Sequence, residues 1–316
     1  MKVAVIDMGT NTFHLLIAEV GTETHEILMR ERRPVKIGEK GINKGEITTQ
    51  AWDRAIQTLI EFHGIIQEQD IEKVFATATS AVRNANNGQA LVEEIFRLTN
   101  IKVEVISGIR EAELIHLGAS KALDFGQQKN LIMDIGGGSI EFIIADNEKA
   151  HWMHSFEIGG QRLVEQFHKE DPISAQDISN LNEFLTEKLA LLFEACKTHE
   201  PATLIGCSGT FDTLSDIHRA AEHIQVDEKA TELPFTIDAF DTIYPHLIAM
   251  PREERLKIPG MIEMRVEMIV VASVLIRFIL DELNIRDIRV SAFALKEGIL
   301  FDVLDRIRKE EKSEKV

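Results

Sequence analysis

Two short segments of the chain place an aspartate just before glycine and hydroxyl residues, in the same order. The first is DMGTNT at 7–12, and the second is DIGGGS at 134–139. A turn of such residues presents several backbone N–H groups to one point, and glycine lets an anion come close. One such turn alone is better explained by an aspartate that caps its own backbone. Two related turns favour phosphate binding, and the predicted ligands in them are Gly9, Thr10, Asn11, Thr12, Gly136, Gly137, Gly138 and Ser139.

The aspartates that precede these turns, Asp7 and Asp134, imply a cation. Two carboxylates beside a bound phosphate repel it unless a positive ion intervenes. Mg²⁺ held by carboxylates, water and phosphate oxygens is the usual arrangement. The sequence therefore predicts Mg²⁺, or another divalent cation, near Asp134 and Asp7.

Other positions could serve the same chemistry, but each signal is weak alone. The run GCSGT at 206–210 opens a helix after a strand, so Gly209 and Thr210 could line a third anion-binding loop. Small residues at such a turn often serve only packing. Arg83, also where a strand meets a helix, could bind phosphate through two N–H groups, although a single arginine there is more often a surface residue.

Glu111 belongs to the run SGIREAE at 107–113, which ends a strand and starts a helix. Its carboxylate could orient a water molecule for attack. A glutamate in a first helical turn also complements the helix dipole, and spacing alone favours this structural role. The basic residues fit a charged edge strand, or alternatively a collar that holds a polyanion, and they are Arg30, Arg32, Arg33, Lys36, Lys40 and Lys44.

The elements expected around these residues occur twice along the chain. The first set has strands at 3–7, 12–20, 25–31, 74–80 and 102–107, and helices at about 49–69, 83–98 and 110–122. The second has strands within 130–146 and at 150–157, 202–206 and 287–291, and helices that include 174–197 and 262–282. Ser174 and Asp177 form a capping box at the start of one of these helices. Each set reads βββαβαβα, with extra helices in the second.

A strand–turn–strand opening that recurs after about 127 residues predicts an α/β protein with two lobes of like fold and a cleft between them. We expect the first lobe to span 1–124 and the second to span 125–298. The final helix, at about 299–316, is expected to pack back on the first lobe.

Composition narrows the class of function. The chain has 35 Lys and Arg against 52 Asp and Glu, a net charge of −17, which argues against coating nucleic acid or an anionic membrane. Cys196 and Cys207 are too few for a disulfide framework and too scattered for a zinc site. The apolar run Met268 to Ile276 is far shorter than the ~20 residues of a membrane span, and no signal-peptide core follows Met1. These features predict a soluble cytoplasmic protein.

The motifs resemble those of the exopolyphosphatase and guanosine pentaphosphate phosphohydrolase family, which has the ribonuclease-H-like fold of the actin, sugar kinase and heat-shock ATPase superfamily. They are AVIDMGTNTFHLLIAEV at 4–20, TATSAVRNANNG at 77–88, VISGIREAELIHLG at 105–118 and LIMDIGGGSIEF at 131–142, with weaker matches IGGQRL at 158–163, GCSGT at 206–210 and ALKEGIL at 294–300. Arg110 departs from the family pattern, because many members carry an acidic residue there.

The resemblance implies roles that spacing alone does not. Glu111 corresponds to the proposed catalytic base, Arg83 and Asn11 to the family's conserved arginine and turn asparagine, Asp134 to the metal-associated aspartate, and Glu141 to the acidic residue after the glycine-rich loop. The implied activity is hydrolysis of the terminal phosphoanhydride of polyphosphate, assisted by Mg²⁺.

Other functions stay open from the sequence. The nearest is a guanosine pentaphosphate (pppGpp) 5′-phosphohydrolase. An ATP-dependent small-molecule kinase and a non-catalytic alarmone-binding protein are alternatives of other classes. Two-lobed enzymes of this kind often pair, so a homodimer is also expected.

Overall fold

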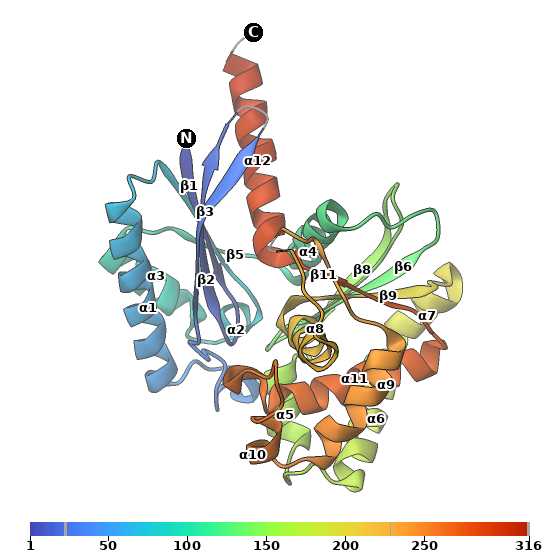
Figure 1. Cartoon of the computed structure of the whole chain (residues 1–316). Helices are drawn as coiled ribbons and strands as arrows, with labels where there is room; N and C mark the ends of the chain where they lie inside the picture. Colours follow the sequence, from blue (N-terminus) through green and yellow to red (C-terminus); the bar gives the residue numbers. More distant parts are fainter. Residues whose placement is uncertain (22–23, 228, 315–316) are drawn as a thin grey trace. The chain divides into compact units, whose positions relative to one another are not determined.

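A computed structural model describes residues 1–21, 24–227 and 229–314, with side chains described as far as Lys309 (Figure 1). The chain divides into two compact units. The first unit comprises Met1–Gly118 and Leu295–Val316, and the second unit comprises Ala119–Ala294.

The first unit is built on a five-stranded sheet in the order β3-β2-β1-β4-β5. Its strands are β1 (Lys2–Met8), β2 (Phe13–Val20), β3 (His25–Arg33), β4 (Lys73–Ala78) and β5 (Val103–Val105). β2 runs antiparallel to β1 and β3, whereas β4 runs parallel to β1 and β5. The basic residues of β3 therefore lie on an edge strand, where charge discourages further pairing.

Helices cover both faces of this sheet. They are η1 (Ile42–Lys44), α1 (Thr49–Glu68), α2 (Ser80–Arg83), α3 (Gly88–Thr99), α4 (Gly108–Ala122) and α12 (Leu295–Glu314). α1 and α3 pack on one face through a core that includes Ile6, Phe13 and Phe62 (Figure 1). α12 packs against β1 and β2. The side chain of Thr48 caps α1 by accepting a hydrogen bond from the Ala51 N–H.

The helix predicted near 83–98 is found as α3, but it starts later than predicted, at Gly88, because residues 80–83 form the separate short helix α2 and a turn follows them. The side chain of Asn84 donates back to the Ser80 carbonyl at 3.0 Å. The amide of Asn87 exchanges two hydrogen bonds with the backbone of Ile47, at 2.9 and 2.8 Å. The partner of Asn87 is 40 residues away in the sequence, so a local pattern could not reveal this break.

The second unit repeats the arrangement with one strand added. Its sheet has the order β10-β11-β9-β6-β7-β8, so β8-β7-β6-β9-β11 matches β3-β2-β1-β4-β5. The strands are β6 (Asn130–Ile135), β7 (Ile140–Ala145), β8 (Ala150–Phe156), β9 (Thr203–Cys207), β10 (Glu232–Leu233) and β11 (Ile288–Ser291). β10 is the addition, and it pairs antiparallel with the outer edge of β11.

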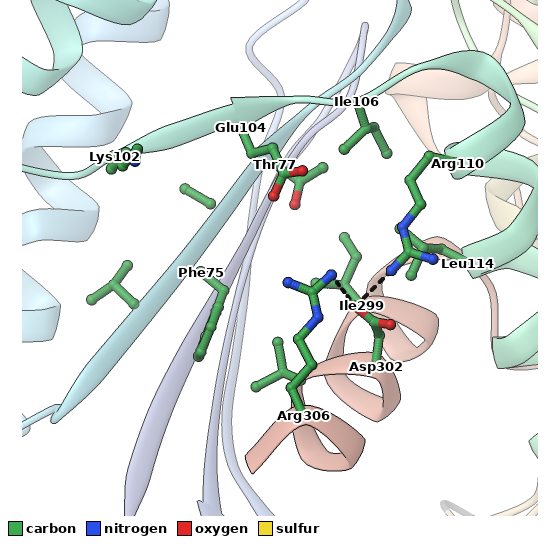
Figure 2. A pocket seen from close by; sticks show the side chains of 13 residues that line it. Phe75, Thr77, Lys102, Glu104, Ile106, Arg110, Leu114, Ile299, Asp302 and Arg306 are labelled. Atoms are coloured by element: carbon green, nitrogen blue, oxygen red, sulfur yellow. Dashed lines mark ion pairs between the residues drawn. The ribbon is translucent and has the colours of Figure 1, made fainter. Parts of the chain in front are cut away.

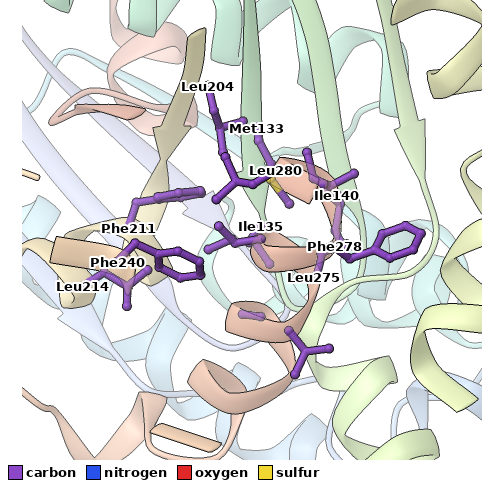
Figure 3. Close-up of a cluster of buried hydrophobic side chains, with 14 of the residues drawn as sticks. Met133, Ile135, Ile140, Leu204, Phe211, Leu214, Phe240, Leu275, Phe278 and Leu280 are labelled. Atoms are coloured by element: carbon purple, nitrogen blue, oxygen red, sulfur yellow. The ribbon is translucent and has the colours of Figure 1, made fainter. Parts of the chain in front are cut away.

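One face of this sheet carries the larger core. The helices are α5 (Gly160–Phe167), α6 (Ala175–Lys188), α7 (Ala190–His199), α8 (Ser208–Glu222), α9 (Ile237–Ala249), α10 (Arg252–Arg255), η2 (Glu263–Arg265) and α11 (Met268–Leu283). Phe211 and Phe240 meet Met133 and Ile135 of β6 and the apolar side chains of α11 (Figure 3). Gly206 serves this packing, because a Cβ there would lie 2.1 Å from the Phe211 ring.

Two more helix predictions need correction. The helix expected at 174–197 opens at the predicted cap, where Ser174 accepts the Asp177 N–H, but it breaks at Leu189. The core contains Leu185, Leu189 and Leu192 from this region. The helix expected at 262–282 starts at Met268, after a 3₁₀ turn. The Val266 carbonyl accepts a hydrogen bond from buried Arg255 at 3.0 Å instead of starting the α-helix.

Within the described residues, no helix combines the length and the hydrophobicity that crossing a membrane requires. Cys196 and Cys207 are both buried free thiols, and burial raises the pKa of Cys196 to about 12.

Candidate active site

The segment that follows β3 donates backbone hydrogen bonds to the turn between β1 and β2. Gly9 N–H donates to the Thr12 carbonyl at 3.1 Å, and the carbonyls of Thr10 and Asn11 accept from Gly38 N–H at 3.3 Å and Lys36 N–H at 2.9 Å. In a trans peptide the N–H points opposite to the C=O. The N–H groups of Asn11 and Thr12 therefore point away from this supporting segment.

The turn between β6 and β7 has the same design with one more bond. The carbonyls of Gly136, Gly137 and Gly138 accept from the N–H groups of residues 160, 161 and 159, at 2.8, 2.8 and 3.1 Å. Three successive N–H groups, on residues 137 to 139, consequently point to the other side of the turn. Such a run of N–H groups is an anion nest.

The segment after β8 lies so close to the turn that position 159 must be a glycine. A Cβ on Gly159 would lie 2.4 to 2.5 Å from the backbone of Gly137 and Gly138. Arg162 adds a side-chain bond from its Nε to the Gly138 carbonyl at 2.8 Å. The sequence pointed to this segment only weakly, through the IGGQRL match, and gave no support role to Lys36 or Gly38.

Two predicted metal ligands of the second unit lie directly opposite each other. Asp134 on β6 pairs with Glu141 on β7, and both are buried. Their neighbours on each strand belong to the helix-covered core, so both carboxylates lie on the other face of the sheet. Asp134 accepts a hydrogen bond from the Ser208 hydroxyl and Glu141 accepts one from the Ser155 hydroxyl, each at 2.6 Å.

This pair fits a divalent cation. Like charges directly opposite on neighbouring strands destabilise a sheet unless they are neutralised. No group of three or more His, Cys, Asp or Glu among the described residues is placed to hold a metal by itself. Mg²⁺ commonly binds one or two carboxylates and takes its other ligands from water and substrate phosphate. Asp134 and Glu141 supply that minimal protein set.

Asp7 occupies the position in the first unit that Asp134 occupies in the second. It is buried at the end of β1, but His14, not a carboxylate, stands opposite it on β2. An imidazole can neutralise Asp7 without a metal. Metal binding by Asp7 stays a prediction.

Arg83 and Glu111 meet in the first unit. Arg83 Nη1 lies 2.9 Å from Glu111 Oε2 and also donates to the Ile106 carbonyl at 3.1 Å. Glu111 is 6% exposed. Its N–H starts the α4 ladder by bonding the Ser107 carbonyl at 2.9 Å. An ion pair this sheltered orients the carboxylate firmly, which sequence spacing did not predict.

The loop at the start of α8 has features of a ligand site beyond packing. Ser208, which binds Asp134, has a positive φ of 66°, a conformation that costs energy for a residue with a side chain. A Cβ on Gly209 would lie 2.1 Å from Arg265 Nη2, so a guanidinium lies across the first turn of α8. Thr210 Oγ1 is buried and has no hydrogen-bond partner among the described residues. The same is true of Thr12 Oγ1 in the first unit. The sequence did not predict the contact of Ser208 with Asp134 or the position of Arg265 beside Gly209.

The sequence and the fold are similar to those of known proteins. The model of the Ppx/GppA phosphatase family matches residues 16–307. Exopolyphosphatase 1 of Mycobacterium leprae is 26% identical over 310 residues, which cover 96% of this chain and 90% of that protein.

Solved structures agree over nearly the whole chain. The crystal structure of an exopolyphosphatase from Cytophaga hutchinsonii is 44% identical, covers 96% of this chain and 98% of its own, and superposes with a TM-score of 0.93. The Aquifex aeolicus member of the Ppx/GppA family is 27% identical with a TM-score of 0.78, covering 98% of each chain. The predicted fold class, an α/β protein with two units of like fold, is confirmed. The chain belongs to the Ppx/GppA phosphatase family.

Proposed function

We propose that the protein is an exopolyphosphatase, which hydrolyses the terminal phosphoanhydride of inorganic polyphosphate and releases orthophosphate. The observation that carries the proposal is the turn at 136–139, whose three carbonyls are tied down so that three N–H groups serve an anion beside the buried carboxylates Asp134 and Glu141. The names of the similar proteins from Mycobacterium leprae and Cytophaga hutchinsonii support polyphosphate as the substrate.

Different residues of the chain bind the phosphate groups and the cation. The N–H groups of the two turns hold phosphoryl oxygens, and the hydroxyls of Thr12 and Thr210 and the first turn of α8 at Gly209 add donors. Arg83 both holds Glu111 and contacts phosphate, because a guanidinium carries five N–H donors. When bound at Asp134 and Glu141, with Asp7 as a further predicted ligand, Mg²⁺ would neutralise charge on the phosphoryl oxygens.

Glu111 is the general base. Its carboxylate accepts a proton from water as the water oxygen forms a bond to the terminal phosphorus. The anhydride P–O bond breaks, and the shortened polyphosphate leaves with the electron pair of that bond. Phosphoryl transfer asks mainly for positioning and charge stabilisation, which explains why an anion nest and a fixed carboxylate suffice in kind.

The test replaces this base. In Glu111→Gln we expect kcat on polyphosphate to fall by about 10²–10⁴ while KM changes little, because a general base acts in the transition state. Glu113→Gln, the same change two residues along α4 at an exposed position, is the control. Thermal unfolding of both variants shows whether loss of the Arg83 ion pair alters the fold.

The same assay separates the substrates. Phosphate release from polyphosphate of defined lengths is measured beside guanosine pentaphosphate, with and without Mg²⁺. A higher kcat/KM on guanosine pentaphosphate would assign the enzyme to the nucleotide. Normal turnover by Glu111→Gln would reject the role of Glu111, and no release from polyphosphate with any divalent metal would reject the function.

A further inference from the structure

The first unit contains a pocket of about 360 Å³ that the proposed reaction does not use (Figure 2). It lies between β4, β5, α4 and α12, at the parallel edge of the sheet. This volume falls within the usual range for small-molecule sites.

Two arginines at this pocket share one acid. Asp302 on α12 lies 2.7 Å from Arg110 Nη2 and 2.6 Å from Arg306 Nη2. Figure 2 shows both guanidinium groups pointing toward Asp302. Arg110 Nη1 also lies 3.0 Å from Glu113 Oε2, an acid outside the lining, so Arg306 is the arginine that has no carboxylate to itself. Lys102 adds a third cation that has no ion-pair partner among the described residues, and Glu104 is the other acid of the lining. The lining therefore carries three basic and two acidic side chains, in a chain whose net charge is −17.

The rest of the lining is apolar. Phe75 presents a half-buried ring from β4. Further apolar side chains come from Ile106 just after β5, from Leu114 of α4, and from Ile299 and Val303 of α12. A small inorganic anion would use only the guanidinium groups and leave this surface in contact with water. An organic anion with a ring would contact the guanidinium groups and the apolar surface together.

We propose that this pocket binds a small organic anion, whose anionic group lies against Arg306 and Arg110 and whose apolar ring lies on Phe75 and Val303. Arginine suits such a group because its planar guanidinium matches carboxylate and phosphate oxygens. Arg306 is bonded to Asp302 through one nitrogen and is half exposed, so it can turn toward a ligand without leaving that acid.

The pocket is joined to the proposed base through α4. Arg110 precedes Glu111 in the first turn of this helix. α4 and α12 are in close contact, since a Cβ on Gly298 would lie 1.8 Å from the Leu114 carbonyl. A ligand that draws Arg110 away from Asp302 therefore acts on the turn that carries Glu111. This consequence for catalysis rests on the proposed function, whereas binding itself does not.

The probe for binding is 8-anilinonaphthalene-1-sulfonate, an aromatic anion whose fluorescence rises in an apolar site. We expect saturable binding at one site per chain. Arg306→Gln should raise its Kd about tenfold, the loss expected for one charge-assisted hydrogen bond. Lys309→Gln removes the same charge from α12 outside the pocket and should leave Kd unchanged. Phe75→Leu should also weaken binding, because the ring contact is lost.

The outcomes separate the two claims. No saturable binding, equal Kd values for the two α12 variants, or equally effective competition by inorganic sulfate would overturn the organic-anion site. Saturating probe should change kcat for phosphate release in the wild type, and Arg306→Gln should abolish that change at the same probe concentration. Binding without any effect on kcat would reject the proposed effect on Glu111 but would still support the organic-anion site. If the chain releases no phosphate from polyphosphate, the proposed function fails while the fluorescence titration still decides the pocket.

Discussion

The two hairpin turns share a backbone design but differ in the residues that stand behind them. Each turn has four residues, and in each the segment after the third strand donates N–H groups to the turn carbonyls. In the second unit the aspartate faces Glu141, whereas in the first it faces His14. Duplication thus preserved the anion-binding geometry and allowed the charges behind it to diverge. We therefore expect the carboxylates of the second unit to depend on a cation more than Asp7 does.

The supporting bonds differ as well. Three turn carbonyls are held in the second unit, with Arg162 as a further donor, against two in the first. The second turn should therefore be the more rigid of the two. We therefore propose that the second unit binds most of the cation and phosphate, while Glu111 of the first unit activates water.

The largest expected effect comes from removing a carboxylate behind each turn. Asp134→Asn keeps the size and an acceptor for Ser208 but lowers the charge of the cation pair, so we expect kcat/KM to fall about 10³-fold and the Mg²⁺ requirement to rise. Asp7→Asn, the matched change in the first unit, should cost at most about tenfold and shift the Mg²⁺ titration less than Asp134→Asn does. Equal losses, with equal shifts in the Mg²⁺ titration, would show that the two aspartates share one role.

A smaller effect is expected when the supporting glycines acquire a Cβ. In Gly159→Ala the new carbon meets backbone of the turn at 2.4 to 2.5 Å, which cannot yield without moving the nest. We expect about 2–3 kcal/mol of destabilisation and weaker phosphate binding. In Gly38→Ala the nearest atoms are the side-chain ends Thr10 Cγ2 at 2.6 Å and Ile42 Cδ1 at 3.0 Å, which can rotate, so the loss should be about 1 kcal/mol.

Urea unfolding followed by fluorescence gives both free energies of unfolding, and calorimetric titration with inorganic phosphate gives the binding change. The test is which of the two variants loses more free energy of unfolding. A Gly38→Ala variant that loses more stability than Gly159→Ala would contradict the view that the second turn is the more firmly supported.

The sequence revealed the duplicated part of this molecule better than the rest. The strand–turn–strand openings carry alternating or continuous apolar runs and glycine turns, which are local signals, and the structure has strands and turns at those places. The helix break after Arg83 and the late start at Met268 involve hydrogen bonds to partners outside the local segment, Ile47 and Arg255. No local pattern encodes those partners.

The site shows the same division. Both turns and Glu111 could be recognised, since their residue types and order match family motifs. The ion pair of Arg83 with Glu111 and the contact of Arg265 with α8 join residues 28 and more than 50 positions apart. Gly38 supports its turn through backbone atoms, which every residue possesses. Its side chain of a single hydrogen carries no chemical signature.

The smallest prediction concerns a second sheltered arginine pair, which has no site role. In the second unit fully buried Arg255 lies 2.7 Å from Asp171, and His168 Nε2 lies 3.4 Å from the same carboxylate oxygen. Burial lowers the pKa of His168, and the charge of Arg255 lowers it further, although Asp171 opposes both. The folded protein therefore holds this imidazole neutral at a pH where the unfolded chain would bind a proton. The free energy of unfolding should then fall as the pH drops below about 6.5, the ordinary pKa of histidine, with a contribution of at most ~1.4 kcal/mol per pH unit.

Replacing the imidazole tests this sign. His168→Gln should flatten that part of the stability curve between pH 7 and 5, whereas His246→Gln, at an exposed position on α9, should leave the slope as it is. Urea unfolding at a series of pH values supplies the measurement. The catalytic pair of the first unit contains no histidine, so polyphosphate turnover by His168→Gln should keep the wild-type pH profile wherever the variant is folded. A shifted profile would mean that the Arg255 cluster affects the reaction through Val266 and Arg265, and that the roles of the two units are less separate than their turns indicate.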